Sequence, residues 1–346
     1  MPWFVLVQPR ILPSFCHNGD TSNKHINSEE NWMRAEATTT AIEKRTSQNR
    51  WFMAVFYFCI VTAAAILISG TASGQDKLAN RPIALKAKDN IKLRGFYFPS
   101  DKGKEAITVM VIHEWGGQAA PYRNLVTALK AAGCAVVIPD YRGHGGSRSY
   151  IDMKGNERQF NIAQMTKADV ANIINMDLEA TKRFLKEENN AGRLNMNALV
   201  VIGDGEGCIL GANWTQRDWS FPTIGSRKRG QDVKGLVLIS PDKVLKGMSL
   251  EATLSTPAIM AMPMMLISGE SSKQAATAKR VHKKVEAVRK RAAGGQEIKG
   301  LELNLVKTSL SGPSFINQPG VIPNIVKFVT ENIVIDEETN PWIERK

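Results

Sequence analysis

The stretch that most constrains the fold of this chain lies at residues 198–210, which read ALVVIGDGEGCIL. Apolar and β-branched residues come first, then glycines at alternate positions (Gly203, Gly205 and Gly207), then small and apolar residues that can pack as a helix. This pattern predicts a strand, a sharp turn and a helix. The middle of such a turn is where an exposed nucleophile would stand, but Gly205 has no side chain and cannot attack a substrate.

Strand and helix patterns alternate along the rest of the chain. Strands are predicted at 107–112, 135–138, 199–202, 233–239, 264–268 and 301–307, and two more at 83–88 and 91–98 as a hairpin. Helices are predicted at 122–132, 273–291 and 325–333. A further long helix is predicted to begin after a cap at Thr166. Such alternation predicts an α/β domain over residues 80–335, with a mostly parallel, doubly wound sheet and helices on both faces, followed by a tail at 336–346.

An uncharged apolar run at residues 51–69 precedes this domain. Its length is close to the roughly 20 residues that span a bilayer, and Ala72 and Gly74 are small residues of the kind that a signal peptidase reads. Two alternatives stay open for residues 51–74, a cleaved signal peptide or an uncleaved transmembrane anchor. Both predict an exported domain, periplasmic, secreted or anchored to the membrane. Residues 1–50 are polar and irregular, and we expect them to be disordered.

The formal net charge is +12, and nearly all of the excess lies in the predicted domain. A charge of this size attracts anionic surfaces without specifying a partner. The basic helix at 273–291 either docks on an anionic surface or is a solvated amphipathic helix, since Val281, Val285 and Val288 have helical spacing. No nucleic-acid motif is present, so no nucleic-acid partner is predicted.

The four cysteines, at positions 16, 59, 134 and 208, have neither disulfide nor metal spacing. Cys134 and Cys208 fall in predicted core elements, where we expect small buried apolar residues. Neither a metal nor a cofactor is therefore predicted.

Three segments in chain order carry a family resemblance. Residues 113–117 read HEWGG, residues 139–147 read PDYRGHGGS, and residues 203–207 have the spacing of the G-x-S-x-G nucleophile elbow. Together they resemble the α/β-hydrolase superfamily, in its branch of dienelactone hydrolases and serine esterases and peptidases, over nearly all of residues 80–335. The resemblance implies the fold, whereas activity must be argued from the site.

The family's chemistry needs a nucleophile, an acid and a histidine in that order. By resemblance the nucleophile position is Gly205. The acid position is Ser271 or Ser272 after the strand at 264–268, where Glu270 is the only carboxylate, and the histidine position is Ser311 after the strand at 301–307. The histidines, at 17, 25, 113, 144 and 282, all precede the last strand. A Ser-His-Asp relay in the family's order therefore cannot be assembled.

The resemblance places the remaining pocket around His113, Glu114, Trp115, Asp204 and Glu206. The backbone N–H groups of Trp115 and Glu206 would form an anion-binding niche. Glu114 either faces the pocket and positions a water, or pairs with Arg142 or Arg148. His113 and His144 are expected to brace loops, and a metal site from His113, Glu114 and His144 has no supporting spacing.

Three functions follow as hypotheses. The first is an inactive α/β-hydrolase homologue that acts as an exported binding or scaffold protein, with a small-molecule ligand in the vestigial pocket. The alternative is an active hydrolase of ester or peptide-like substrates with a non-standard site at Glu114, Asp204 or Glu206. The third is a purely structural envelope protein, which would have a filled pocket.

Overall fold

The computed structural model describes residues 79–224, 228–294 and 298–345. The predicted disordered region 1–50 and the predicted signal or anchor at 51–74 lie outside these residues. Within the described residues, no helix is both long enough and apolar enough to cross a membrane.

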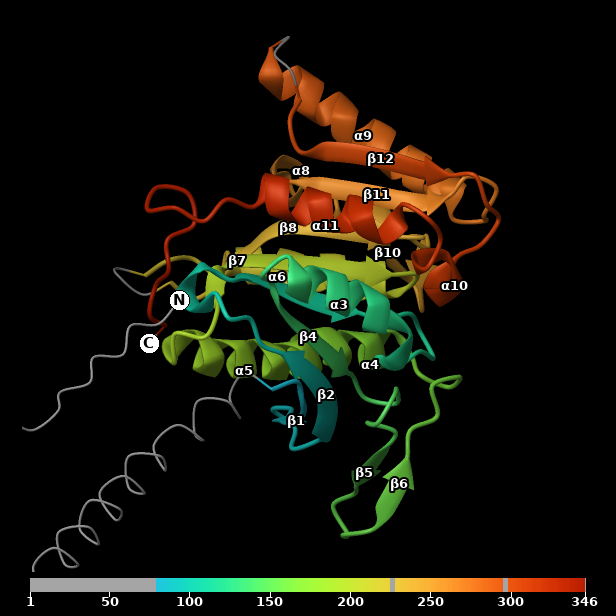
Figure 1. Ribbon diagram of the computed structural model, residues 1–346. Helices are drawn as coiled ribbons and strands as arrows, with labels where there is room; N and C mark the ends of the chain where they lie inside the picture. Colours follow the sequence, from blue (N-terminus) through green and yellow to red (C-terminus); the bar gives the residue numbers. More distant parts are fainter. Residues whose placement is uncertain (1–78, 225–227, 295–297, 346) are drawn as a thin grey trace, which may run out of the picture. The chain divides into compact units, whose positions relative to one another are not determined.

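An eight-stranded sheet forms the centre of the domain (Figure 1). Its strands, in spatial order, are β1 (Arg81–Lys86), β2 (Lys92–Phe98), β4 (Ala135–Asp140), β3 (Ile107–Ile112), β7 (Asn195–Asp204), β8 (Val233–Ile239), β11 (Met264–Gly269) and β12 (Leu301–Val306). β2 pairs antiparallel with β1 and β4, and the remaining pairs are parallel. The predicted α/β fold with a mostly parallel sheet is confirmed.

The burial of each strand follows its sequence pattern. β4 and β7 are buried at every position, as expected of strands covered on both faces. β1 and β2 alternate buried and exposed residues, because the described part of the chain covers only one of their faces.

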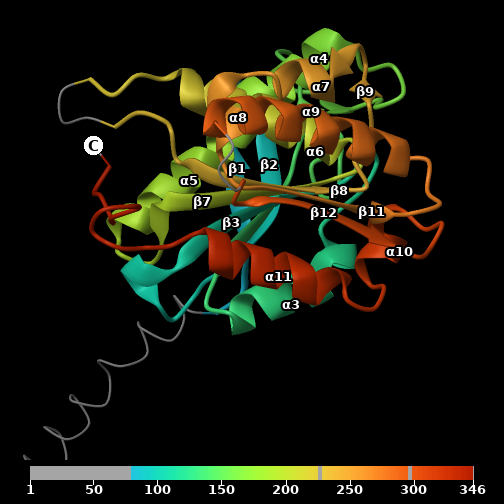
Figure 2. The same cartoon turned by 90° about the horizontal axis from the view of Figure 1, so that it is seen from above.

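Helices cover the two faces of the parallel part (Figure 2). One face packs against α3 (Arg123–Ala131), α10 (Gly312–Ile316) and α11 (Val321–Asn332). The other face packs against α5 (Leu178–Asn190), α6 (Gly207–Ser220) and α9 (Ala275–Ala293). The contacts between the sheet and the helices on each face form a separate buried apolar cluster, so the domain has two hydrophobic cores with the sheet between them.

Shorter elements fill the connections. They are η1 (Gly103–Glu105), η2 (Ala120–Tyr122), the ribbon β5 (Ser149–Ile151) with β6 (Glu157–Gln159), α4 (Lys167–Asn172), the single π turn η3 (Ile173–Asp177), the ribbon β9 (Val244–Leu245) with β10 (Met248–Ser249), α7 (Leu250–Thr253) and α8 (Pro257–Ala261). The predicted cap of α4 is present, since Thr166 and Asp169 form a reciprocal capping box.

The C-terminal segment is docked on the domain. Asn189 and Asn195 donate side-chain hydrogen bonds to the carbonyls of Ile343 and Asn340, each at 2.9 Å. The Trp342 indole in turn donates to the carbonyl of Asn189 at 3.2 Å. Residues 336–345, predicted as a tail, thus add to the packing beside β7 and the end of α5.

Candidate functional site

The turn after β7 has the geometry of a nucleophile elbow. Gly205 has a φ of +55°, in the left-handed region, and α6 begins two residues later. The flanking glycines allow close approach of the backbone. A Cβ on Gly203 would lie 2.6 Å from the backbone N of Cys208, and one on Gly207 would lie 2.3 Å from the carbonyl O of Ile112. The central position is less crowded, because a Cβ on Gly205 would meet its nearest atoms at 3.4 and 3.6 Å.

The loops after β11 and β12 lie side by side, as the triad layout requires. A Cβ on Gly269 would lie 2.6 Å from the carbonyl O of Leu310. The Ser272 hydroxyl donates to the carbonyl of Gly269 at 2.8 Å, and Ser311 stands at the N-cap of α10. Ser272 and Ser311 therefore lie in neighbouring segments after β11 and β12, and neither position carries the acid or the histidine that the family's chemistry needs.

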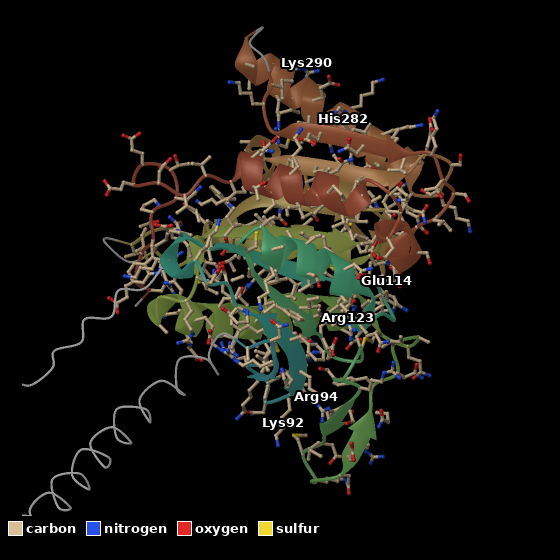
Figure 3. All side chains as sticks on the ribbon, viewed as in Figure 1. Lys92, Arg94, Glu114, Arg123, His282 and Lys290 are labelled. Carbon is tan, nitrogen blue, oxygen red and sulfur yellow. The ribbon has the colours of Figure 1, made fainter. Side chains whose placement is uncertain are left out.

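Glu114 lies between the elbow and the loop after β12. Its Cβ is 3.4 Å from the position of a Cβ on Gly205. Its Oε2 is 2.6 Å from the position of a Cβ on Gly312 (Glu114 is labelled in Figure 3). The Glu114 side chain thus reaches from beside Gly205 to Gly312, the residue that follows Ser311.

The expected anion-binding niche is occupied by the protein's own carboxylate. The backbone N–H of Trp115 donates to Oε2 of Glu206 at 3.2 Å. A negative charge developing on a bound substrate would compete with Glu206 for this donor.

Carboxylates dominate the electrostatics of the site. Burial, and next the charge of Glu206, raise the pKa of Glu114. The same two causes, in the same order, raise the pKa of Asp242, which follows β8 and whose Oδ2 is 3.6 Å from the position of a Cβ on Gly205. Negative charge is therefore concentrated around the elbow with no described lysine or arginine paired to Glu114, Glu206 or Asp242.

Asp204 lies buried beneath this cluster. The Tyr122 hydroxyl donates to its Oδ2 at 2.8 Å, while Oδ1 has no partner among the described atoms. Burial raises the pKa of Asp204 to about 8 in spite of the tyrosine bond, which lowers it. At neutral pH the carboxyl is therefore mostly protonated and adds less charge to the site than an ordinary aspartate would.

The two histidines of the predicted pocket are buried in an aromatic cluster. The His113 ring stacks on Tyr141 with centroids 4.5 Å apart, and His144 packs against Trp115 at 4.6 Å. Their Nδ1 atoms lie 2.9 Å from the carbonyls of Glu114 and Arg142. Burial lowers the pKa of His144 to about 4, so it is neutral above that pH.

The expected pairing of Glu114 with Arg142 is wrong. Arg142 instead binds Asp177, at 2.6 Å from Nη2 to Oδ1, and Asp89, at 2.8 Å from Nη1 to Oδ2. Asp177 ends the π turn between α4 and α5, which places its carboxylate below the loop after β4. No described carboxylate pairs with Arg148 either, so the pairing alternative for Glu114 finds no support.

The described residues provide neither a cluster of metal ligands nor an exposed thiol at this site. Within residues 79–224, 228–294 and 298–345, no group of three or more His, Cys, Asp or Glu side chains is arranged to hold a metal ion. Cys208 is buried, and its thiol donates to the carbonyls of Gly203 and Ile239 at 3.2 and 3.4 Å. Burial raises the pKa of this thiol, which disfavours the nucleophilic thiolate.

Sequence reasoning missed Asp242 and Tyr122 as members of the site. Asp242 could have been found, because it follows a predicted strand and the carboxyl ends of parallel strands meet at one edge of the sheet. Tyr122 gave no such signal, since it resembles any apolar residue at the start of a helix.

Comparisons with known proteins agree with this architecture. The family model described as serine aminopeptidase, S33, matches residues 103–293. The structure of the Pyrococcus furiosus esterase Pf2001 superposes with a TM-score of 0.52 at 16% identity, covering 75% of this chain and 92% of that one. The α/β hydrolase GrgF from Penicillium gives a TM-score of 0.50 at 11% identity, covering 74% and 99%. At these identities the structural matches show the fold alone.

Two bacterial sequences are also similar. An uncharacterized protein of Mycobacterium tuberculosis is 33% identical over 69 residues, which are 20% of this chain and 25% of the relative. The uncharacterized protein YfhR of Escherichia coli is 23% identical over 175 residues, 48% of this chain and 60% of the relative. The matched region thus spans between a quarter and three-fifths of these relatives' lengths.

Proposed function

Since this chain belongs to the serine aminopeptidase S33 family of α/β hydrolases, we propose that it is a member that binds without hydrolysing. In this role it is an exported binding or scaffold protein, either released after cleavage of residues 51–74 or held at a membrane by residues 51–69. The fold and the family do not establish an activity, so the proposal depends on the residues of the site.

The observation that carries the proposal is the position of Glu114. Acyl transfer by this family needs a nucleophile whose proton passes to a histidine. Gly205 supplies no nucleophile, and Glu114 fills the space between it and the loop after β12.

A second obstacle to catalysis is electrostatic. The oxyanion of a tetrahedral intermediate is stabilised by donors aimed at it, and the Trp115 N–H is already bonded to Glu206. The surrounding carboxylates would repel that oxyanion.

The second candidate is a hydrolase with a non-standard site. The raised pKa of Glu114 favours it, because a carboxyl that titrates nearer neutrality is a better general acid or base. In this mechanism Glu114 accepts a proton from a water that attacks the substrate directly.

One assay separates the two candidates. The full-length protein is incubated with a short-chain nitrophenyl ester and with an alanine nitroanilide, beside Glu114→Gln and a matched Glu331→Gln variant. Glu331 is exposed near the end of α11 and lies outside the loops that follow β7, β11 and β12, so the same charge is removed away from the site. We expect no turnover above buffer from any of them. Turnover that Glu114→Gln abolishes and Glu331→Gln retains would overturn the proposal.

The export component has its own test. Cell fractionation with an antibody against the folded domain should place it outside the cytoplasm, and deletion of residues 51–69 should return it to the cytoplasm. A cytoplasmic full-length protein would contradict export while leaving the binding role to be judged by the ester assay.

A further inference from the structure

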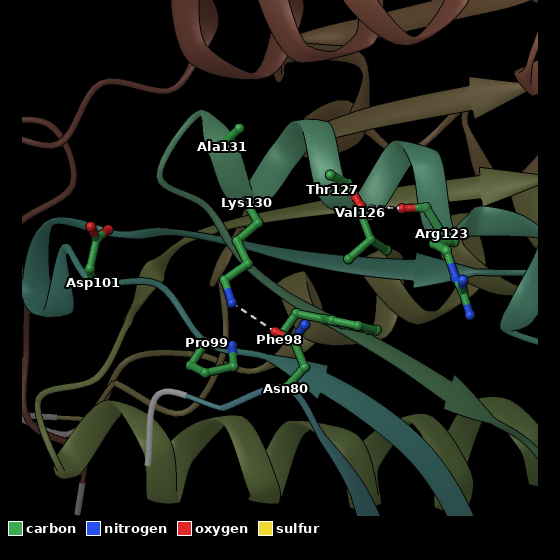
Figure 4. Close-up of a pocket in the computed structure, with 9 residues that line it drawn as sticks. All are labelled: Asn80, Phe98, Pro99, Asp101, Arg123, Val126, Thr127, Lys130 and Ala131. Atoms are coloured by element: carbon green, nitrogen blue, oxygen red, sulfur yellow. Dashed lines mark hydrogen bonds between the residues drawn. The ribbon is translucent and has the colours of Figure 1, made fainter. Parts of the chain in front are cut away.

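A groove lies away from the elbow and is lined by residues of β1, β2 and α3. A cavity of about 830 Å³ is bounded by β1, β2 and the start of α3. It shares Phe98, Arg123 and Val126 with a neighbouring cavity of about 740 Å³ along α3 (Figure 4). We call this pair the β2–α3 groove. Each of the two cavities has the size of a ligand pocket, and no residue of the elbow lines either of them.

The floor of the groove is mostly apolar, because none of the helices that the structure describes covers the outer face of β1 and β2. Pro82 on β1 pairs across the strands with Phe96 on β2, and both point outward. Phe96 is 40% exposed, which is unusual for a large aromatic side chain. Phe98 and Val126 extend the apolar surface toward α3.

The rim of the groove is cationic. Arg94 on β2 and Arg123 on α3 line it from two sides, and Lys92 continues the charge along β2 (Figure 3). Within the described part of the chain, no carboxylate lies within 4.0 Å of either guanidinium. Lys130 donates to Oδ1 of Asn80 at 2.7 Å, at the far end of the groove.

Neither of the two acidic residues that line the groove forms an ion pair with Arg94 or Arg123. Asp140 is buried at the floor, where its Oδ2 accepts the N–H of Gly146 at 2.9 Å and its Oδ1 is 3.6 Å from Nε2 of His113. Asp101 is exposed at the end of the smaller cavity. Two unpaired guanidinium groups above an apolar floor therefore fit a ligand with a phosphate at one end and a hydrocarbon chain at the other.

We propose that the β2–α3 groove binds an anionic phospholipid, with its phosphate at Arg94 and Arg123 and an acyl chain over Phe96 and Phe98. The inference goes beyond the proposed function. It uses the proposed membrane attachment only to argue that the groove can come near a lipid surface. The apolar run at 51–69 ends twelve residues before β1 begins. At about 3.5 Å per residue, at most roughly 40 Å separates the two along the chain.

Photocrosslinking in the full-length protein tests the site. The protein is reconstituted in phosphatidylcholine vesicles with a small fraction of phosphatidylglycerol that carries a photoreactive group in its acyl chain. Labelled peptides are then mapped by mass spectrometry. We expect labelling of residues 92–98 and 123–131, and about tenfold less with the double variant Arg94→Glu/Arg123→Glu.

A matched control makes the same charge change elsewhere. Lys279 and Lys283 are exposed on α9, across the sheet from α3, and have no ion-pair partner among the described residues. Lys279→Glu/Lys283→Glu should leave groove labelling unchanged. The variant Phe96→Ser, which keeps the charges, should lower it several-fold, so a folding defect in one variant does not decide the result.

Three outcomes would overturn the proposal. They are equal groove labelling by a phosphatidylcholine probe, labelling by a photoreactive fatty acid without labelling by phosphatidylglycerol, and loss of labelling with the α9 variant instead of the groove variant. None of them bears on the ester assay, so failure here is distinct from failure of the proposed function.

Discussion

Replacing Gly205 by alanine tests whether this turn is held by backbone strain alone. The φ of +55° is in the region that side chains resist, at a cost of about 1–2 kcal/mol. Packing adds little, because the new Cβ would meet Glu114 Cβ at 3.4 Å and Asp242 Oδ2 at 3.6 Å, which are ordinary contacts. We therefore expect Gly205→Ala to lower the free energy of unfolding by about 1–2 kcal/mol.

Two other glycines calibrate that value. Gly294 has almost the same φ, +56°, and no described atom within 4 Å of its added Cβ, so Gly294→Ala measures the backbone cost without packing. Gly207→Ala would bring a Cβ to 2.3 Å from the carbonyl O of Ile112, which requires the backbone to move. We expect it to cost more than about 4 kcal/mol or to prevent folding.

Urea unfolding followed by circular dichroism measures all three variants. For a domain of this size, each kcal/mol corresponds to roughly 2–4 °C in Tm, so thermal scans give an independent check. The reasoning is refuted if Gly205→Ala costs over about 3 kcal/mol more than Gly294→Ala, or if it stabilises the protein.

Three further predictions concern the site and the docked C-terminal segment. The pKa of Asp204 is about 8 in the folded protein and near 4 in the unfolded chain, so the folded state holds this proton more tightly. The resulting contribution to the free energy of unfolding is fully present below pH 4 and is lost as the pH rises to about 8. Asp204→Asn should remove this pH-dependent loss of stability. Relative to the parent, the variant should therefore become more stable from pH 4 to pH 8, by at most about 5 kcal/mol in the free energy of unfolding. Tm values measured across this pH range follow the change, and a difference in Tm that stays constant would contradict the raised pKa of Asp204. Glu206→Gln should lower the pKa of Glu114, followed by NMR titration, without returning it to its ordinary value, because burial is the larger cause; an unchanged titration would show that the two carboxylates do not interact. Asn189→Ala breaks the bonds to the Met196 N–H and the Ile343 carbonyl and should cost about 1–3 kcal/mol in urea unfolding, with faster hydrogen exchange at residues 340–345; exchange that stays slow would mean that the segment is held by other contacts.

The sequence predicted where the strands lie along the chain, because apolar runs bounded by glycines are local patterns. The positions Gly205, Ser272 and Ser311 came from the family resemblance and not from those patterns. In the structure they lie in the segments that follow β7, β11 and β12.

Contacts that depend on the direction in which a side chain points could not be predicted from the sequence. Glu114 meets Gly312 from a loop 198 positions earlier in the chain, and nothing local signals that approach. Arg142 was expected near Glu114, yet its side chain turns to Asp177, whose position depends on a π turn that no pattern marked. The exposed face of β1 and β2 was equally hidden, because a period of two does not tell which face a helix will cover.

The packing of α6 against the sheet depends on the elbow turn, so the presence of this turn says little about activity. Gly207 lets α6 approach the carbonyls of Ile112 and His113, and the Cys208 thiol bonds the carbonyls of Gly203 and Ile239. These contacts join α6 to three strands, and they require the turn whatever residue occupies its centre. Reinstating a serine at position 205 would then restore the hydroxyl but neither a histidine partner nor a free Trp115 N–H. Because each of these is needed for acyl transfer, a single reversal at Gly205 should leave the protein without turnover.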